Sequence, residues 1–279
     1  MNLLSKTFAL IVALAFGCVL RAQPVIEVYL NVVAPASRGA NFSCVEETHE
    51  TLVLKGEKVP TFRIVKKFNS LGKLISEIKY NSAGGVQYEI SWDYNAMGEP
   101  VRKFMRQFIN YKGWTTEEVQ FKYNDTTGYL LDMFFLYEKV KKQSAQINCD
   151  SIGRIKEVLI YNESGAFTNI ERLLYVPANN SLRVVVLRSS EQFVAAYIYP
   201  LDYTKQPPKS SLKREYYPSG DIMLETLPDS KMEQGYYYEY KFDSYGNWVE
   251  KFTYQCTVSS SNKVKNKKLE YKITRKITY

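Results

Sequence analysis

Residues 68–98 read FNSLGKLISEIKYNSAGGVQYEISWDYNAMG and contain the same short unit three times. Each unit has an aromatic residue, then Asn, two variable residues and Gly, and the residues between units alternate between apolar and polar. Asn favours turn entry because its side chain bonds nearby backbone groups, and Gly takes the positive φ that hairpin loops often need. The stretch therefore predicts antiparallel strands joined by tight turns.

The same unit recurs along the rest of the chain. Full copies lie at 161–165 and 242–246, and looser copies lie at 123–128, 149–153 and 216–220. We predict that the glycines of these units are structural turn residues: Gly72, Gly84, Gly98, Gly128, Gly153, Gly165, Gly220 and Gly246. The pattern predicts an all-β fold, an antiparallel meander of repeated hairpins that forms a curved open sheet or an incomplete β-spiral.

The first 22 residues have the pattern of a secretory signal peptide. Lys6 precedes an apolar run at 8–20, and a small residue, Ala22, ends the segment. This run is shorter than the roughly 20 residues that span a bilayer, so we expect cleavage after Ala22. The alternative is lipoprotein processing at Cys18, although the bulky Phe16 fits the required sequence poorly.

The remaining residues, 23–279, are long enough for one large β domain or two small ones, and we predict a single β-repeat domain. The Pro207-Pro208 pair makes 204–211 the best candidate for a sub-boundary, and an Ω-like loop within one domain is an equal alternative. Residues 25–33 read as a strand, and residues 259–268 read as an exposed basic loop before the last strand.

Three cysteines follow the signal segment: Cys44, Cys149 and Cys256. An odd number in an oxidising compartment permits at most one internal disulfide and leaves one free thiol. Their wide spacing does not select a pair. We expect buried small side chains or one incidental disulfide, and no catalytic thiol.

The excess of positive charge lies at the C-terminal end of the chain. Residues 256–279 contain seven Lys or Arg and one acidic residue, whereas residues 23–255 contain 28 of each sign. Nucleic-acid binders usually carry a basic face across a recognisable module, and none is present, so we expect no nucleic-acid partner. The basic end, with Lys265, Lys267 and Lys268, has two readings: a solvated loop, or a peripheral contact with anionic envelope lipids.

The sequence offers no catalytic, metal-binding or cofactor-binding pattern. His49 is the only histidine, and its spacing from Cys44 matches no known nucleophile pair or zinc site. The adjacent carboxylates Glu46-Glu47 and Glu117-Glu118 point to opposite faces of a strand. We therefore expect a solvated polar strand or loop around His49, and we assign no catalytic residue, metal or cofactor.

Aromatic residues are the remaining candidates for a binding surface. Tyr236, Tyr238 and Tyr240 share one face of a predicted strand, and Trp248 follows in the next. An exposed aromatic row can stack on sugars or grip a partner, whereas ordinary cross-strand packing is the alternative.

The units at 94–98 and 242–248 resemble degenerate copies of the YD repeat of rearrangement-hot-spot (RHS) proteins. Residues 62–279 are also similar to small exported YD-repeat-like proteins of Gram-negative bacteria, which often end in a strand like Arg275–Tyr279. The resemblance implies a curved sheet or an incomplete spiral. Large RHS proteins wind such hairpins into a shell around a toxin or ligand. This chain has eight units, and no effector domain is recognised in it, so enclosure of a cargo is not expected.

The sequence thus favours an exported, non-enzymatic β-repeat protein of the periplasm, the outer-membrane surface or the extracellular space. Its expected partner is a protein or a glycan. A small outer-membrane β-barrel is the first alternative, and a hydrolase with an unrecognised site is the second.

Overall fold

Nearly all of the described residues beyond position 43 lie in strands or in the turns between them. The computed structural model describes residues 24–33, 42–51, 61–202, 213–226, 234–259 and 263–279. Neither the signal segment 1–22 nor the predicted sub-boundary at 204–211 falls within these residues. None of the helices in these ranges is long and apolar enough to cross a membrane.

The described part of the chain forms one antiparallel sheet of 17 strands. The first nine are β1 (Cys44–Thr51), β2 (Phe62–Phe68), β3 (Leu74–Tyr80), β4 (Val86–Tyr94), β5 (Pro100–Ile109), β6 (Gly113–Tyr123), β7 (Leu130–Tyr137), β8 (Val140–Cys149) and β9 (Ile155–Asn162). The others are β10 (Phe167–Val176), β11 (Ser181–Arg188), β12 (Phe193–Pro200), β13 (Lys213–Tyr216), β14 (Ile222–Thr226), β15 (Gln234–Phe242), β16 (Trp248–Val258) and β17 (Val264–Thr278). A short 3-10 turn, η1 (Pro177–Asn179), joins β10 to β11.

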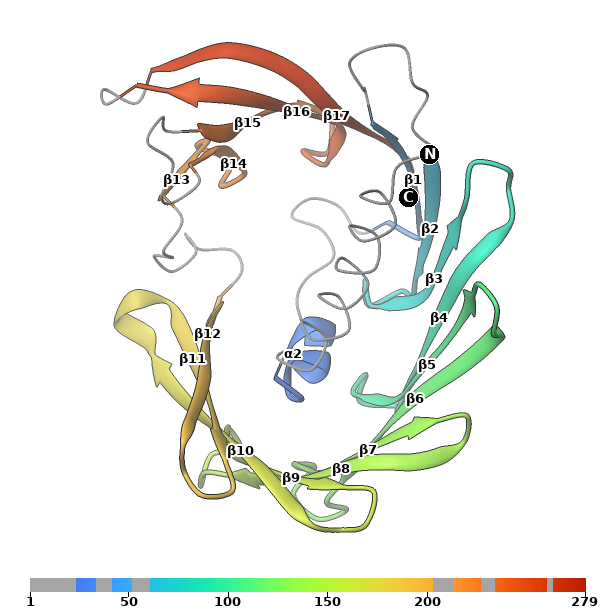
Figure 1. Cartoon of the computed structure of the whole chain (residues 1–279), viewed down its shortest axis with the longest axis vertical. Helices are drawn as coiled ribbons and strands as arrows, with labels where there is room; N and C mark the ends of the chain where they lie inside the picture. The colour runs from blue at the N-terminus through green and yellow to red at the C-terminus, as the bar shows by residue number, and fades with distance from the viewer. Residues whose placement is uncertain (1–23, 34–41, 52–60, 203–212, 227–233, 260–262) are drawn as a thin grey trace, which may run out of the picture.

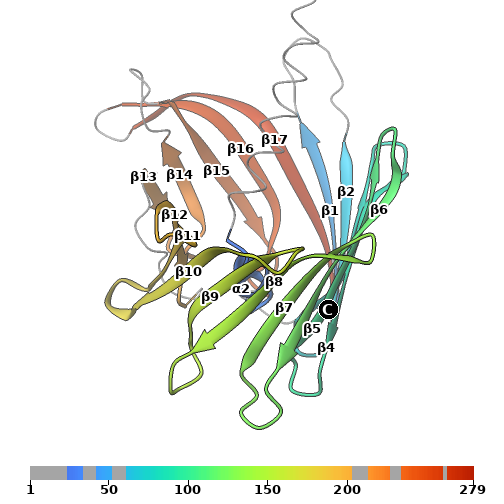
Figure 2. The same ribbon diagram turned by 60° about the horizontal axis from the view of Figure 1, so that its bottom comes forward.

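Each strand pairs with the next in the chain from β1 to β12 and again from β13 to β17. β1 also pairs with β17, which brings the two ends of the sequence together. No pairing joins β12 to β13 within the described ranges, so the sheet is not closed. Figures 1 and 2 show the sheet curling around the helix α2 (Glu27–Val33). The predicted all-β meander of hairpins is confirmed.

The repeated unit forms one kind of turn. At Asn69 the side-chain Oδ1 accepts hydrogen bonds from the amides of Leu71 and Lys73, at 3.0 and 2.9 Å, while Gly72 N–H donates to the Asn69 carbonyl. The same two side-chain hydrogen bonds, to the second and fourth following residues, occur at Asn81, Asn95, Asp150, Asn162 and Asp243. The side chain therefore fixes the path of each loop from within it.

The turn also explains the glycine at its fourth position. All eight glycines predicted as turn residues have φ between 70 and 84°. A side chain in this left-handed region would bring Cβ against the following carbonyl. The looser unit at 216–220 has Tyr217 where the others have Asn or Asp, and it keeps only the backbone hydrogen bonds of the turn.

Tyrosines tie neighbouring turns together along one edge of the sheet. The hydroxyl of Tyr94 donates to the carbonyl of Leu74 at 2.7 Å, and Tyr123 and Tyr175 do the same to Pro100 and Ile155. Each acceptor begins the strand that pairs with the strand carrying the tyrosine. Tyr94 and Tyr123, the aromatic residues of their units, and Tyr175, which precedes η1, therefore each lie at or next to the end of a strand and brace the hairpin.

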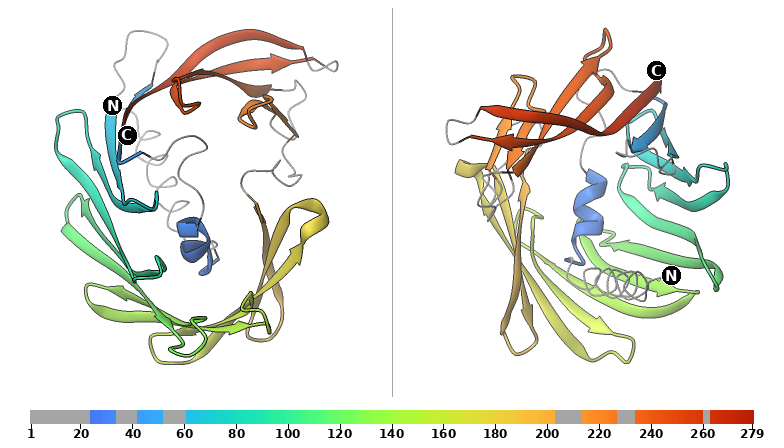
Figure 3. Two further views of the ribbon diagram at one scale, coloured as in Figure 1. Left: turned by 180° about the vertical axis from the view of Figure 1, so that it is seen from behind. Right: turned by 45° about the horizontal axis from the view of Figure 1, so that its top comes forward.

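The hydrophobic core lies on the concave face, where α2 packs (Figure 3). Ile26, directly before α2, is fully buried in the largest apolar cluster. The sheet contributes the other buried members: Trp92, Val119, Phe121, Leu130, Met133, Ala145, Ile147, Ile155, Val158, Ile160, Leu173, Leu182 and Val184. Strand alternation puts their sequence neighbours on the convex face.

The convex face carries rows of ion pairs. Arg106 pairs with Glu89 at 2.5 Å and Arg102 with Glu118 at 3.1 Å, in both cases between neighbouring strands. Arg172 is 2.7 Å from Glu191. The convex face therefore combines ion pairs with exposed apolar side chains such as Phe108 and Trp114, whereas the concave face over much of β4–β12 holds the largest buried apolar cluster.

Two sequence predictions fail in detail. Residues 25–33 were expected to form a strand, but Glu27–Val33 is a helix that lies inside the curved sheet rather than along an edge. The reason is tertiary: the β-branched and aromatic side chains that suit a strand also fill the apolar wall, and packing overrides local propensity. The expected basic loop at 259–268 is shorter than predicted, because β17 already begins at Val264.

Replacing Gly246 with Val should destabilise the protein. Gly246 has φ +81°, and a Cβ added there meets nothing within 4 Å, so the loss would report backbone strain alone. We expect about 1–2 kcal/mol in urea unfolding. Gly246→Asn is the matched control and should lose less, because Asn tolerates this conformation. Equal stability of Gly246→Val and the wild type would contradict the assignment of the turn.

Candidate functional site

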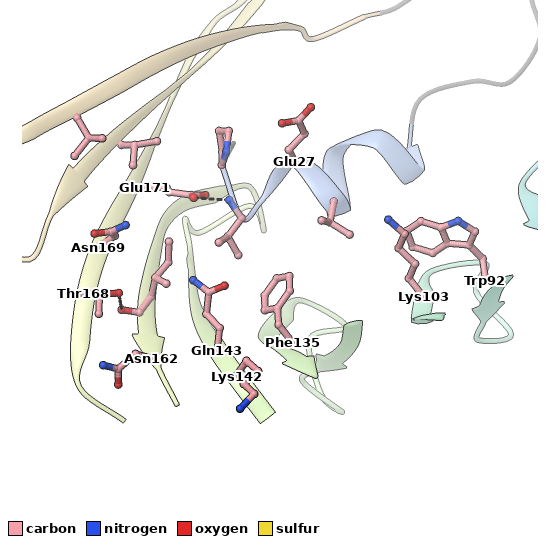
Figure 4. A pocket seen from close by; sticks show the side chains of 16 residues that line it. Glu27, Trp92, Lys103, Phe135, Lys142, Gln143, Asn162, Thr168, Asn169 and Glu171 are labelled. Atoms are coloured by element: carbon pink, nitrogen blue, oxygen red, sulfur yellow. Dashed lines mark hydrogen bonds between the residues drawn. The ribbon is translucent and has the colours of Figure 1, made fainter. Parts of the chain in front are cut away.

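A cavity of about 690 Å³ lies between α2 and the concave face of the sheet (Figure 4). Its lining comes from the start of the described chain and from strands β4 to β12. These residues line it: Pro24, Val25, Glu27, Val28, Trp92, Lys103, Phe135, Lys142, Gln143, Ile160, Asn162, Thr168, Asn169, Glu171, Val186 and Val194. The volume is in the range of small-molecule sites.

The floor of this cavity follows one cross-strand row of the sheet. Strand register places Trp92 opposite Lys103, Lys103 opposite Val119, Val119 opposite Phe135, Phe135 opposite Gln143, and Gln143 opposite Asn162. Neighbouring strands are about 4.8 Å apart, so Lys103 and Gln143 are separated by about 14 Å along the row. The row thus carries a cation at one end, an aromatic ring in the middle and two amides at the other end.

The amides of the row have hydrogen-bonding capacity to spare. Within the described ranges, the side chains of Gln143 and Asn169 form no hydrogen bond, and the Asn162 side chain uses its Oδ1 in the turn but not its Nδ2. Gln143 and Asn169 are half-buried and Asn162 is exposed. These groups can donate to and accept from a polar ligand.

Lys103 is a second lining group that has no ion-pair partner among the described residues. Its ammonium lies 5.4 Å from the centroid of the Trp92 ring, and within the described chain it has no ion pair or hydrogen bond. Burial lowers the pKa of Lys103, and the nearby charges of Glu117 and Glu77 oppose that effect. Lys142, also in the lining, differs because it pairs with Glu163 at 2.9 Å.

Glu171 fixes the start of α2. Its carboxylate is 1% exposed and accepts hydrogen bonds from the amides of Val25 (2.5 Å) and Ile26 (3.0 Å). Burial raises the pKa of Glu171 to about 7, with a smaller contribution from the charge of Glu27, while the two amides act in the opposite direction. A carboxyl group with a raised pKa can act as a general acid. Here both oxygens are taken by backbone amides, so its role is to hold α2.

A second polar cluster lies on the same concave face, where β1 joins β17 and β2. Glu47, 4% exposed, accepts from Arg275 at 2.8 Å and from Lys66 at 3.2 Å, and it lies 3.3 Å from His49. Despite its burial, Glu47 has its pKa lowered to about 2, because His49, Lys66 and Arg275 favour the ionised carboxylate.

His49 belongs to this cluster and is not the solvated residue expected from the sequence. Its ring stacks on Phe62 at 4.3 Å and bonds the hydroxyl of Tyr271. Cys44 lies in the same strand as His49, five residues earlier, so the two side chains point to opposite faces of the sheet. No group of three or more His, Cys, Asp or Glu side chains in the described ranges is arranged to hold a metal ion.

The structure places Tyr236, Tyr238 and Tyr240 on one face of β15, but all three are half-buried. Lys251 lies over the rings of Tyr238 and Tyr240, at 4.6 and 5.7 Å. Trp248 contacts Tyr240 edge-on and is covered by the guanidinium of Arg275 at 3.3 Å. Tyr238, Tyr240 and Trp248 thus pack against cations or one another rather than forming an open stacking platform.

The three lysines proposed for the basic end are exposed, and register places Lys268 in one cross-strand row with Tyr236, through Gln255. Lys267 pairs with Glu239 at 3.1 Å and lies over the ring of Tyr237, on the opposite face of β15. Lys265 and Lys268 lie in β17, opposite Thr257 and Gln255. The predicted binding residues are therefore divided between two faces.

The three cysteines within the described residues are unpaired. Cys44, Cys149 and Cys256 are all free thiols, and burial raises the pKa of Cys149 and Cys256. The expectation of small buried side chains fits Cys256, which is 3% exposed, while the other two are half-buried.

Sequence reasoning missed Lys103, Gln143, Asn169 and Glu171. One signal was present for Glu171: it occupies a concave-face position in the alternation of β10, two residues before the buried Leu173. The others are ordinary polar residues in strands. Their assembly depends on register across several strands, which the sequence does not display.

Comparisons with known proteins identify no family. No family model matches the chain, and no curated protein matches it. A porin-like protein from Bacteroides uniformis ATCC 8492 is similar in structure, with a TM-score of 0.43 and 11% identity over 86% of this chain and 98% of that one. TcdB2-TccC3 gives a TM-score of 0.30 and 12% identity over 73% of this chain, which spans only 14% of that one. At these scores neither likeness assigns a function.

Replacing Glu171 with Gln should reduce the pH dependence of stability. The folded protein keeps this proton up to a pKa of about 7, whereas the ordinary value is 4.5. Stability from this group is therefore fully present below the lower value and is lost as pH rises through the higher one. We expect a wild-type loss on the order of 1 kcal/mol per pH unit between them.

Urea unfolding at both ends of that interval measures this loss. The Glu171→Gln variant should show a flatter profile, and Glu163→Gln, which changes an exposed carboxylate, should keep the wild-type slope. Parallel profiles for the wild type and Glu171→Gln would show that Glu171 does not carry the effect.

Proposed function

We propose that this chain is an exported, non-enzymatic binding protein that holds a glycan in the cavity between α2 and the concave face of the sheet. The supporting observation is the cross-strand row from Trp92 to Asn162, which combines aromatic, cationic and amide side chains along one floor. Sugars present hydroxyl groups and apolar ring faces, and amides and aromatic side chains complement these.

The dimensions of the row favour an extended ligand. About 14 Å from Lys103 to Gln143 spans several linked sugar rings rather than one. Asn169 and Thr168 widen the amide end, since both line the cavity from β10. A protein segment is the less favoured occupant, because the polar groups along the floor are side chains rather than backbone groups.

The charge distribution supports a water-exposed protein over the outer-membrane barrel. Membrane barrels present an apolar band outward, and Arg or Lys at mid-membrane on that face costs about 2–4 kcal/mol. Here the outward face of β4–β6 carries the Arg102 and Arg106 ion pairs beside the exposed Phe108 and Trp114, so it is not a continuous apolar band, and the largest buried apolar cluster faces inward.

The hydrolase alternative has no supporting arrangement in the described residues. The buried carboxyl of Glu171 has both oxygens bonded to α2, and Glu47 is held ionised by three cations or donors. Neither is free to transfer a proton to a ligand.

Loss of the amide at Gln143 should weaken glycan binding. Gln143→Leu keeps the size of the side chain but removes its hydrogen bonds, and we expect affinity to fall about tenfold for a bound oligosaccharide. Gln146→Leu is the matched control, because Gln146 is exposed on the convex face of the same strand. Calorimetric titration against a panel of oligosaccharides gives the affinities. Equal losses in both variants, or no binding by the wild type, would contradict the proposal.

Export should yield a protein that is released without detergent. We expect N-terminal sequencing of the exported protein to begin at Gln23, after cleavage behind Ala22. A lipid-modified Cys18 at the N-terminus would establish the lipoprotein alternative. Recovery only in detergent-extracted membranes, with no lipid attached, would favour the membrane barrel.

A further inference from the structure

The cavity contains one charged group whose placement its protein neighbours do not explain. Lys103 lies on the concave face of β5, between Trp92 and Val119 in register, and its ammonium reaches no carboxylate within ion-pair distance in the described chain. A half-buried ammonium without a counter-ion is unfavourable, since burial penalises its charged form. A ligand that brings a negative charge would relieve this penalty.

The other charges of the lining are already engaged. Lys142 pairs with Glu163 at 2.9 Å, and the Glu171 carboxylate accepts from two backbone amides. Glu27 lies on α2 and accepts a hydrogen bond from the Tyr199 hydroxyl. Burial raises the pKa of Tyr199, and the charge of Glu27 and this hydrogen bond add to the effect. Lys103 is therefore the lining charge that is left for a ligand.

The arrangement separates this charge from the acidic side of the cavity. Figure 4 shows Lys103 beside Trp92 at one end, with Asn169 and Glu171 at the other. The carboxylates that influence Lys103, Glu117 and Glu77, do not pair with it. Glu77 accepts the hydroxyl of Tyr88 at 2.5 Å and lies 3.9 Å from Lys66.

We propose that the ligand of this cavity is an acidic oligosaccharide, in which a uronate carboxylate pairs with Lys103 while hydroxyl groups bond Gln143, Asn162 and Asn169. This inference rests on the proposed function, because it names the class of glycan that the same site takes. Lys103 is then the residue that determines specificity for charge, and the amides bind acidic and neutral sugars alike.

The test compares each acidic oligosaccharide with its own carboxyl-reduced form. Oligosaccharides of polygalacturonate, alginate and hyaluronan are titrated against the wild-type protein, and each is paired with the neutral product in which the carboxylates have become hydroxymethyl groups. We expect at least one acidic member to bind about tenfold more tightly than its neutral partner. Added salt should reduce that preference, because it screens the ion pair.

Three variants locate the effect. Lys103→Gln should abolish the preference for the acidic form, so that the acidic and neutral members of each pair bind with affinities within about twofold of each other. Lys103→Arg should retain the preference, which also shows that the strand tolerates substitution. Lys122→Gln is the matched control, since this lysine is exposed on the convex face of β6 and does not line the cavity, and it should behave as the wild type.

The outcomes distinguish charge recognition by Lys103 from glycan binding in the cavity. Acidic and neutral forms that bind the wild type equally, or a preference that survives in Lys103→Gln, would overturn the role of Lys103 and leave glycan binding intact. Absence of binding by every acidic and neutral oligosaccharide would overturn both.

Discussion

The structure depends on a side-chain oxygen that organises a five-residue turn. At Asn69 and its counterparts, Oδ1 accepts two backbone amides while the glycine takes a positive φ. A turn of fixed geometry sets the register of the hairpin, and register decides which alternate residues face inward. Because the same turn recurs, successive hairpins present the same face to the same side, and the sheet acquires one continuous concave wall.

That wall is not uniform. From β4 to β12 it is largely apolar and packs against α2, whereas near β1 and β17 it holds the cluster around Glu47. The polar cluster lies where strands from opposite ends of the sequence meet, Glu47 and Arg275 being partners in register. Buried ion pairs are weak evidence of stability but restrict pairing, because a shifted register would leave a charge without its partner. We interpret Glu47 as the group that makes the joint between β1 and β17 specific.

The features that could be predicted from sequence are those that depend on the spacing of residues close together in the chain. The aromatic-to-glycine unit revealed the turns, and the alternation after Gly72 and Gly246 revealed the strands. The helix at Glu27–Val33 could not be predicted, because its residues are good strand formers and its conformation follows from contacts with Glu171 and the apolar wall. The cavity could not be predicted from the sequence for a related reason. Lys103 and Gln143 are 40 positions apart in the sequence. They share one row only because β5 pairs with β6, β6 with β7 and β7 with β8 in the observed registers.

Fold and site therefore use different residues of the same strands. Turn residues lie at the edges of the sheet, where they hold the loops, and the cavity is built from mid-strand positions that the turns leave unrestricted. Such a scaffold can change its ligand by substitution on the concave face without disturbing a turn. Asn162 is the exception, because it is both a turn residue and a residue that lines the cavity. Its Oδ1 holds the turn between β9 and β10, while the residue also lines the cavity. Only its amide nitrogen is left for a ligand, so at this position a residue required by the fold also supplies a polar group to the site.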